Sequence, residues 1–317
     1  MTTDVRTATA MVFPGMGPTP FEEVGRFMVI NPFARKLVAE ADRVLGYSLV
    51  DRYRQTEGDY SEYAQVAFML NSLALARWAE QALGVEAALC AGPSFGEKPA
   101  AAYCGALDFP DAVLATARFA RLLDDYFSTG FKDLVTLSFV RVPEEKLRGV
   151  LAELDERGEA YEISSYVDDD FFMLTLREHN LAELEPRLRS LGGLPLYSMR
   201  PPMHCSLFGE LRERAEAEVF GALEYAEPRV PVVSDQDGSL ITTGAGVRAM
   251  LLDSCVLPMR WPAVVDALRG AGVGTVCVAG HDRLFGRVRR TTEAFEVLPV
   301  TPRFALQPRR GPRPADS

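Results

Sequence analysis

Residues 85–107 read VEAALCAGPSFGEKPAAAYCGAL, and three kinds of local structure follow one another within them. An apolar segment ending at Ala91 has the length and composition of a buried strand, and the alanine-rich residues after Pro99 favour a helix. Between them, residues 92–96 fit the pattern G-x-S-x-G, in which a serine on a strained turn exposes its hydroxyl group. The glycines are needed because a Cβ at either position would collide across the turn. The stretch predicts a reactive serine, Ser94, while an ordinary tight turn with a capping serine would also fit.

Strands and helices alternate on both sides of this stretch. The segment ATAMVFPGMG predicts a short buried strand that runs into a glycine turn, and RVPVVS and VGTVCVAG predict later strands. The expected helices cover about 21–46, 63–83, 110–127, 206–223, 243–255 and 261–271. This alternation predicts an α/β fold with a mainly parallel sheet covered by helices, formed by residues 1–128 and 199–305.

Residues 129–198 follow a different order. We expect, in this order, the strand LVTLSFVRV, the helix PEEKLRGVLAELDERG, the strands AYEISSYV and FFMLTLR, the helix LAELEPRLRSLGG and the strand LPLYSM. This β-α-β-β-α-β order is the ferredoxin-like pattern, so we expect a small subdomain inserted into the larger one. The Pro- and Arg-rich residues 306–317 predict a disordered tail.

Composition excludes several classes of protein. The chain has 317 residues, of which 48% are hydrophobic and 25% charged, as in globular proteins. Its net charge of −10 argues against binding to nucleic acid, which requires a basic face. No apolar run approaches the roughly 18 residues that a membrane span needs, and the first residues lack the layout of a secretory signal. We therefore expect a cytoplasmic protein without a membrane or nucleic-acid partner.

The five cysteines are odd in number, scattered, and contain no CxxC pair. This distribution is typical of a reducing compartment and predicts neither a disulfide framework nor a zinc site. We expect no bound metal.

A serine nucleophile needs a base, and the chain has three histidines. His179 lies in the polar stretch REHNLAELE and is expected at the surface. His281 follows a predicted strand and could lie near the serine. His204 lies between a rigid two-proline segment and a helix, where it is well placed to present one ring nitrogen to a pocket. The residues alone favour His204, and leave His281 and a role in core packing open.

Six short motifs, in order, resemble the landmarks of malonyl-CoA:acyl-carrier-protein transacylases and of the acyltransferase domains of polyketide synthases. They are FPGMG at 13–17, Gln65 within AQVAFM, GPSFGE at 92–97 with GAL at 105–107, MHCSL at 203–207, PMRW at 258–261 and VAG at 278–280. The resemblance covers roughly residues 9–292. It implies a large α/β-hydrolase-like domain with a ferredoxin-like insertion, as the order of elements also predicts.

The resemblance implies roles for individual residues. Ser94 would attack a thioester carbonyl while His204 accepts the hydroxyl proton, in a ping-pong cycle through an acyl-Ser94 ester. The backbone N–H groups of Met16 and Phe95 would form the oxyanion hole, and the backbone carbonyl of Ser254 would orient the histidine ring. The enzyme would bind no cofactor, because the acyl group travels on the phosphopantetheine of a carrier protein.

The expected acyl pocket, formed by Gln65, Pro93, Phe119 and Met203, departs from the family. Phe119 stands where malonyl-transferring members have an arginine that grips the malonyl carboxylate, and a buried carboxylate without a partner costs several kcal/mol. Pro93 replaces a histidine, and Met203 suits an irregular, longer chain. We therefore expect a non-carboxylated acyl group. The chain then resembles the stand-alone acyltransferases that move aminoacyl or dipeptidyl groups between carrier proteins in macrolactam antibiotic biosynthesis.

Three alternatives remain: an editing acyl hydrolase with the same dyad, an acyl-CoA-dependent loading acyltransferase, and a non-catalytic docking protein. The expected partners are donor and acceptor carrier proteins, including a polyketide synthase loading carrier domain. Because carriers are acidic, a basic docking surface is expected, although ordinary solvated arginines fit equally well. The candidates are Arg148, Arg187, Arg189, Arg287, Arg289 and Arg290.

Overall fold

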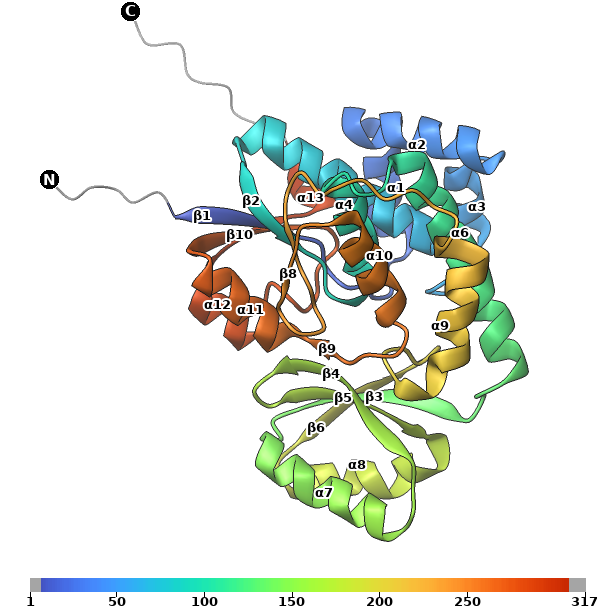
Figure 1. Ribbon diagram of the computed structural model, residues 1–317, viewed down its shortest axis with the longest axis vertical. Coiled ribbons are helices and arrows are strands. Elements are labelled where there is room, and N and C mark those ends of the chain that lie inside the picture. Colours follow the sequence, from blue (N-terminus) through green and yellow to red (C-terminus); the bar gives the residue numbers. More distant parts are fainter. Residues whose placement is uncertain (1–6, 308–317) are drawn as a thin grey trace, which may run out of the picture.

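The computed structural model describes residues 7–307 and divides them between two sheets (Figure 1). The larger sheet has six strands in the order β11-β10-β1-β2-β7-β8. They are β1 (Ala8–Val12), β2 (Ala87–Ala91), β7 (Val232–Val233), β8 (Leu240–Ile241), β10 (Val273–Ala279) and β11 (Glu296–Val300). All neighbours pair in parallel except β7 and β8. The predicted mainly parallel sheet is confirmed.

Helices cover both faces of this sheet. Along β1, Met11 belongs to one buried cluster, and Ala10 and Val12 belong to another, because successive side chains point to opposite faces. The helices around the sheet are α1 (Phe21–Ile30), α2 (Pro32–Leu45), α3 (Leu49–Gln55), α4 (Glu62–Leu83), α5 (Glu97–Tyr103), α6 (Phe109–Thr129), α9 (Gly209–Ala215), α10 (Gly244–Asp253), α11 (Trp261–Gly270), α12 (Arg289–Ala294) and α13 (Pro302–Ala305). Short helical turns lie at η1 (Ser94–Gly96), η3 (Ser206–Phe208) and η4 (Glu216–Phe220). Buried residues of α11 lie in the second cluster, and those of α1, α2, α4 and α6 lie in the first.

The single helix expected over 21–46 is two helices. Asn31 ends α1 and begins α2, where its side-chain oxygen accepts the backbone N–H groups of Phe33 and Ala34 at 3.0 and 3.3 Å. Pro32 follows at the first helical position, where its missing N–H costs nothing. The helical periodicity of the two segments hid this break.

The small subdomain forms the second sheet, in the order β6-β3-β5-β4-β9. Its elements are β3 (Leu134–Val140), α7 (Glu144–Glu156), β4 (Tyr161–Asp168), β5 (Phe171–Arg177), η2 (Glu178–Asn180), α8 (Leu181–Ser190) and β6 (Leu194–Met199). The first four strands pair antiparallel, and Leu147, Leu184 and Leu188 of the helices share one buried cluster with the sheet. The predicted ferredoxin-like order is confirmed.

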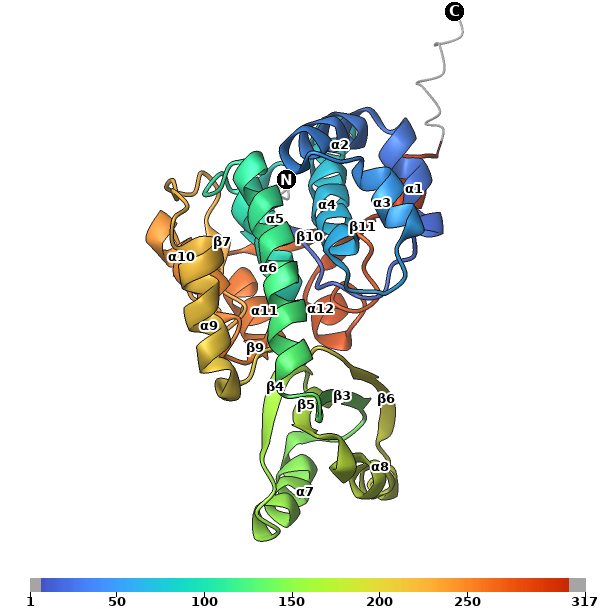
Figure 2. The same ribbon diagram turned by 90° about the vertical axis from the view of Figure 1, so that its right-hand side faces the viewer.

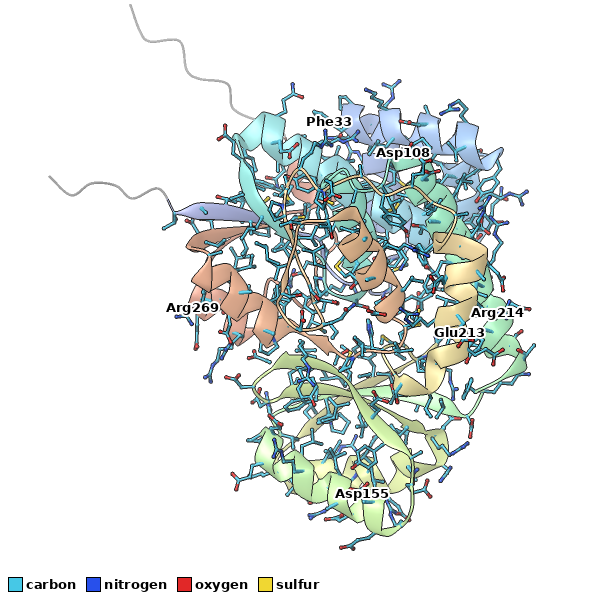
Figure 3. The ribbon with its side chains drawn as sticks, viewed as in Figure 1. Phe33, Asp108, Asp155, Glu213, Arg214 and Arg269 are labelled. Carbon is cyan, nitrogen blue, oxygen red and sulfur yellow. The ribbon has the colours of Figure 1, made fainter. Side chains whose placement is uncertain are left out.

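Two elements connect the domains. Helix α6 runs from the large domain to the start of β3 (Figure 2), and β9 (Met259–Arg260), which follows α10, pairs in parallel with β4. Helix α9 lies against α6, and Arg214 of α9 forms an ion pair with Asp125 of α6 at 3.0 Å. Figure 3 labels Arg214 on α9. The small sheet is therefore held beside the loops at the carboxyl ends of β2 and β7.

Among the helices of residues 7–307, none combines the length and the apolar character that crossing a bilayer demands.

Candidate active site

Ser94 lies on a sharp turn between β2 and α5. Its φ of 54° falls in the left-handed region, which a non-glycine residue seldom adopts. A Cβ added to Gly92 would lie 1.9 Å from the Gly96 carbonyl oxygen, and one added to Gly96 would lie 2.1 Å from that of Phe13. The turn therefore closes only with glycine at both positions. Pro93 fits the extended backbone that precedes the serine, with φ −63° and ψ 133°.

His204 approaches this serine from the loop before η3. Its Nε2 lies 2.8 Å from Ser94 Oγ, and its Nδ1 lies 3.3 Å from the carbonyl oxygen of Leu257. Because a carbonyl only accepts, Nδ1 carries the proton and Nε2 is left as the acceptor for the serine hydroxyl. The structure thus brings together the two residues that the sequence selected.

The prediction that the backbone carbonyl of Ser254 orients the ring of His204 is wrong. Its hydroxyl donates to Leu251 O at 3.2 Å at the end of α10, and the carbonyl that faces the ring belongs to Leu257, three residues later. The chain turns after α10 before it meets the histidine, and a sequence motif does not determine which carbonyl of such a turn points to the ring.

Hydrogen bonds at two places hold residues 203–206, called here the histidine loop. Cys205 N donates to Cys255 O at 3.2 Å, in the loop that also carries Leu257. On the other side, the carboxylate of Glu162 in β4 accepts from Ser206 N at 2.9 Å and from Ser206 Oγ at 2.7 Å. Sequence reasoning missed Glu162, because its contacts join segments that lie 44 residues apart.

Two buried carboxyl groups lie under the serine turn. Asp235 Oδ2 accepts the backbone N–H of Ser94 at 2.6 Å, and Glu97 adjoins Asp235 and accepts from Gln236 Nε2 at 3.2 Å. Burial raises the pKa of Asp235 to about 6, and burial together with Asp235 raises the pKa of Glu97 well above its usual range. Asp235 Oδ1 has no donor among the described groups, and a proton on Glu97 would supply one. Both carboxyl groups therefore bind a proton more readily than an exposed carboxyl group does.

Burial lowers the pKa of His204 to about 4. The positive charge of Lys98 lowers this pKa further, whereas the hydrogen bond to the Leu257 carbonyl raises it. The imidazole is therefore neutral at physiological pH. A neutral ring can accept a proton, as a general base must.

The expected pocket residues are buried to different extents. Gln65 of α4 is buried and donates to Tyr60 O at 2.8 Å. Phe119 of α6 is only 2% exposed and packs against the ring of Phe220 at 5.5 Å. Met203 and Met16 are half-buried against the same core. Lys98 had no role in the sequence argument, yet its Nζ lies 4.9 Å from the centroid of the Phe119 ring.

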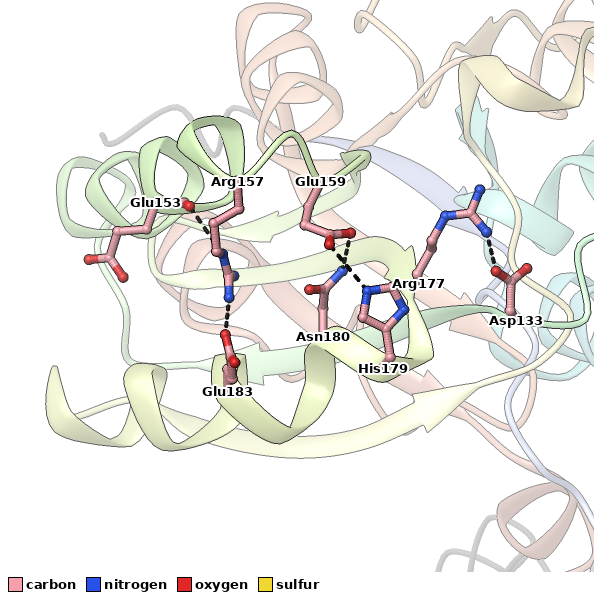
Figure 4. A network of polar contacts seen from close by, with 8 residues as sticks. All are labelled: Asp133, Glu153, Arg157, Glu159, Arg177, His179, Asn180 and Glu183. Atoms are coloured by element: carbon pink, nitrogen blue, oxygen red, sulfur yellow. Dashed lines mark hydrogen bonds and ion pairs between the residues drawn. The ribbon is translucent and has the colours of Figure 1, made fainter.

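The other two histidines lie elsewhere. His281 Nε2 is 3.1 Å from Glu23 and accepts from Arg283 Nε, so its ring faces α1 and not Ser94. His179 is an exposed residue of the small subdomain, and Figure 4 shows its contact with Glu159. The two side chains lie 3.2 Å apart. Its expected surface position is confirmed.

Five of the six candidate docking arginines pair with acidic neighbours. The pairs are Arg148–Glu144, Arg187–Glu153, Arg189–Glu185, Arg289–Glu293, and Arg290 with Asp169 and Asp266. Arg287 is exposed. Surface pairs contribute about 0–1 kcal/mol each, so an acidic partner could exchange with them. The docking surface stays a prediction.

All five cysteines are buried free thiols. No cluster of three or more potential metal-ligating side chains occurs between residues 7 and 307.

Comparisons with known proteins bear on the family and the fold of this chain. Residues 138–199 match the family model of the VinK acyltransferase small domain. A malonyl CoA-acyl carrier protein transacylase of Bacillus subtilis is 25% identical over 302 residues, covering 92% of this chain and 93% of that protein.

Two solved structures share the fold over most of the chain. One is a malonyl-transacylase in complex with its type II polyketide synthase acyl-carrier protein, with a TM-score of 0.82 and 23% identity over 93% of this chain and 96% of that chain. The other is the acyltransferase domain from the second module of the salinomycin polyketide synthase, with a TM-score of 0.78 and 23% identity over 94% of this chain and 69% of that chain. Over most of its length, the chain is thus similar to malonyl-transacylases and to a polyketide synthase acyltransferase domain, and its residues 138–199 match the small domain of the VinK acyltransferase.

Proposed function

We propose that this protein moves an acyl group from one carrier protein to another through an ester on Ser94. The observation that carries the proposal is the 2.8 Å contact between Ser94 Oγ and the neutral Nε2 of His204. His204 would take the serine proton as Oγ attacks the thioester carbonyl, and would give it to the departing thiolate. A second carrier thiol would then give its proton to His204 as its sulfur attacks the ester carbonyl, and His204 would pass that proton to the departing Ser94 Oγ, which restores the serine.

The backbone around the serine supports this chemistry. Phe95 directly follows Ser94, and Met16 lies in the loop after β1, the neighbour of β2. Loops that follow adjacent parallel strands meet at the same edge of the sheet. We propose that the N–H groups of Met16 and Phe95 stabilise the negative oxygen that forms during attack. The Leu257 carbonyl has a separate role, because it orients the ring of His204.

The partners we propose are carrier proteins that present the acyl group on phosphopantetheine. One structural neighbour is a malonyl-transacylase in complex with an acyl-carrier protein, and the relative from Bacillus subtilis is named for transfer to such a carrier. The six arginines named above are the proposed contacts, and Arg287 is the first to test, because it is exposed and, within residues 7–307, forms no ion pair of 4 Å or less.

The acyl group we propose is non-carboxylated, of the aminoacyl or dipeptidyl kind used in macrolactam polyketide biosynthesis. Phe119 supports this, because its ring packs against Phe220 and leaves no guanidinium to grip a carboxylate at that position. Half-buried Met203, next to His204, offers an adaptable wall to a longer chain.

Transfer and hydrolysis can be separated directly. We expect an acylated carrier to lose its acyl group rapidly only when a second carrier with a free phosphopantetheine thiol is present. Mass spectrometry of both carriers and of the released acid, with and without the acceptor, measures this. Stoichiometric release of free acid without an acceptor would instead establish an editing hydrolase.

Glu162 should affect the reaction through the position of His204. In Glu162→Ala, Ser206 loses its acceptor and the histidine loop loosens, so we expect kcat/KM to fall by about tenfold, as for one lost charged hydrogen bond. Glu162→Gln keeps an acceptor oxygen and should retain most of the activity. Equal losses in both variants would show that the charge of Glu162, and not its hydrogen bonds, is what matters.

A further inference from the structure

The loop after β7 supports both halves of the Ser94–His204 pair. Asp235 follows this strand and is buried. Its side-chain Oδ2 accepts the backbone N–H of Ser94 at 2.6 Å, and its backbone carbonyl accepts the N–H of Arg260 at 2.6 Å. Arg260 lies in β9, three residues after Leu257, whose carbonyl faces the His204 ring. One buried residue therefore joins the serine turn to the segment that orients the histidine.

Gln236 holds the other end of that segment. Its side-chain Nε2 donates to the carbonyl oxygen of Met250, in the last turn of α10, at 2.8 Å. The same nitrogen donates to Glu97 Oε1 at 3.2 Å, under the serine turn. A primary amide has two N–H groups, so both are used. Turning the amide over would place its oxygen against the Met250 carbonyl, and the orientation of the side chain is therefore fixed.

Residues 251–259 lie between these two attachment points and carry the contacts of the histidine. The chain leaves α10, turns, and enters β9 (Figure 1). Within this stretch, Cys255 O accepts the N–H of Cys205 at 3.2 Å, and Leu257 O lies 3.3 Å from His204 Nδ1. Both contacts are made by backbone carbonyls, which move with the chain. A shift at either attachment point therefore moves the ring of His204.

The β7–β8 hairpin that carries both attachments is itself fixed. The two strands pair antiparallel, and in the turn between them Ser234 N donates to Ser239 O at 2.9 Å and Gly238 N donates to Ser234 O at 3.0 Å. A Cβ added to Gly238 would lie 2.6 Å from the carbonyl oxygen of Ala263 in α11. The hairpin therefore packs closely against α11 and gives both attachments a firm support.

We propose that Gln236 is a positioning residue for His204. Together with Asp235, it sets the distance between Ser94 Oγ and the imidazole. The inference rests on the proposed acyl transfer and adds a residue to its machinery. Ser94 and His204 lie 110 residues apart in the chain, and their contact of 2.8 Å depends on how the two segments are held. A displacement of about 1 Å can lower a rate by about a hundredfold, and the amide of Gln236 opposes it by tying α10 to the support of the serine turn.

The test uses a fluorophosphonate, because this reagent reports the activation of the serine whatever the acyl specificity. Ser94 Oγ forms a bond to phosphorus, His204 takes the hydroxyl proton, and fluoride leaves. Gln236→Met keeps the length of the side chain and removes both donors. We expect it to slow labelling by about tenfold to a hundredfold. Intact-protein mass spectrometry over time measures the rate, and Ser94→Ala identifies the labelled residue.

Asp237→Ala is the matched control in the same hairpin. Asp237 is exposed, and its Oδ1 accepts the N–H of Ser239 at 2.9 Å within the turn. The variant weakens the hairpin without removing a contact to the serine turn or to α10. We expect labelling within about twofold of the wild type, because surface substitutions of this kind have small effects.

His204→Ala separates the positioning of the base from a general loosening of the site. Residues that act as one unit have non-additive effects. Once the histidine is absent, Gln236→Met should therefore change the remaining labelling rate by less than about twofold. A general loosening would slow labelling by the same factor with and without His204. That equal loss would overturn the role of Gln236 in favour of a purely structural one.

Labelling of folded Gln236→Met at the wild-type rate would also overturn the inference. Circular dichroism and thermal melting establish folding, and Gln236→Leu gives the same comparison if methionine disturbs the hairpin. The proposed function is tested separately, with β-alanyl and alanyl-β-alanyl groups on the phosphopantetheine of an acyl carrier protein. A wild type that is phosphonylated at Ser94 and takes an acyl group from neither carrier contradicts the proposed acyl transfer, and not the role of Gln236.

Discussion

Replacing Ser94 by alanine will abolish the covalent acyl adduct and reduce acyl transfer by at least about a thousandfold, as for other enzymes that lose their nucleophile. Ser94 Oγ lies 2.8 Å from His204 Nε2, so the substitution removes the hydroxyl group that the histidine can activate. Incubation with acylated carrier followed by intact-protein mass spectrometry reports the adduct directly.

The alanine variant should remain folded. Ser94 has a φ of 54°. Backbone strain in that left-handed region is similar for serine and alanine, since both carry a Cβ. The backbone N–H of residue 94 still donates to Asp235, so the turn keeps its main support. Ser94→Cys, which keeps a nucleophile, is the matched control. An adduct that persists in folded Ser94→Ala would remove Ser94 from the mechanism.

Much of the site follows from short-range rules. Gly92 and Gly96 can be recognised in the sequence, because any Cβ there would strike backbone atoms of the same turn or of the adjoining loop. The histidine that acts as base could be predicted because the chain has only three histidines. The ferredoxin-like order of residues 134–199 could be predicted because strands and helices differ in the spacing of their apolar residues.

The supports of the site could not be predicted in the same way. Asp235 meets the serine turn across 141 residues and Glu162 meets the histidine loop across 44, and periodicity carries no information on such pairs. The carbonyl that faces His204 belongs to Leu257 and not Ser254, because a loop of several residues decides which oxygen turns inward.

Lys98 shows how a local argument can mislead. From the sequence alone, phenylalanine at position 119 predicts an apolar pocket wall without a cation. In the structure, a lysine from the helix after the nucleophile brings a cation to the same ring. Phe119 and Lys98 lie on different helices, so the residue at position 119 does not by itself determine the charge near that ring.

Replacing His204 by alanine should slow formation of acyl-Ser94 by about a thousandfold, within the range for removal of a general base. The protonation of His204 should leave the rate nearly constant from pH 5 to pH 8 and lower it below pH 5, because burial lowers the His204 pKa to about 4. The sign follows from the chemistry: below that pKa the imidazole holds a second proton and cannot accept one from Ser94. Single-turnover acylation rates in buffers of constant ionic strength measure the profile.

Asp235 provides the control, since its pKa of about 6 could add an inflection of its own. Asp235→Asn keeps an acceptor for the Ser94 N–H and removes that titration, so any inflection near pH 6 should vanish in this variant. An inflection near pH 6.5 that survives in Asp235→Asn would mean that His204 titrates like an exposed histidine. The imidazole would then be open to water instead of buried against Leu257, and the neutral base on which the reaction depends would be only partly populated at physiological pH.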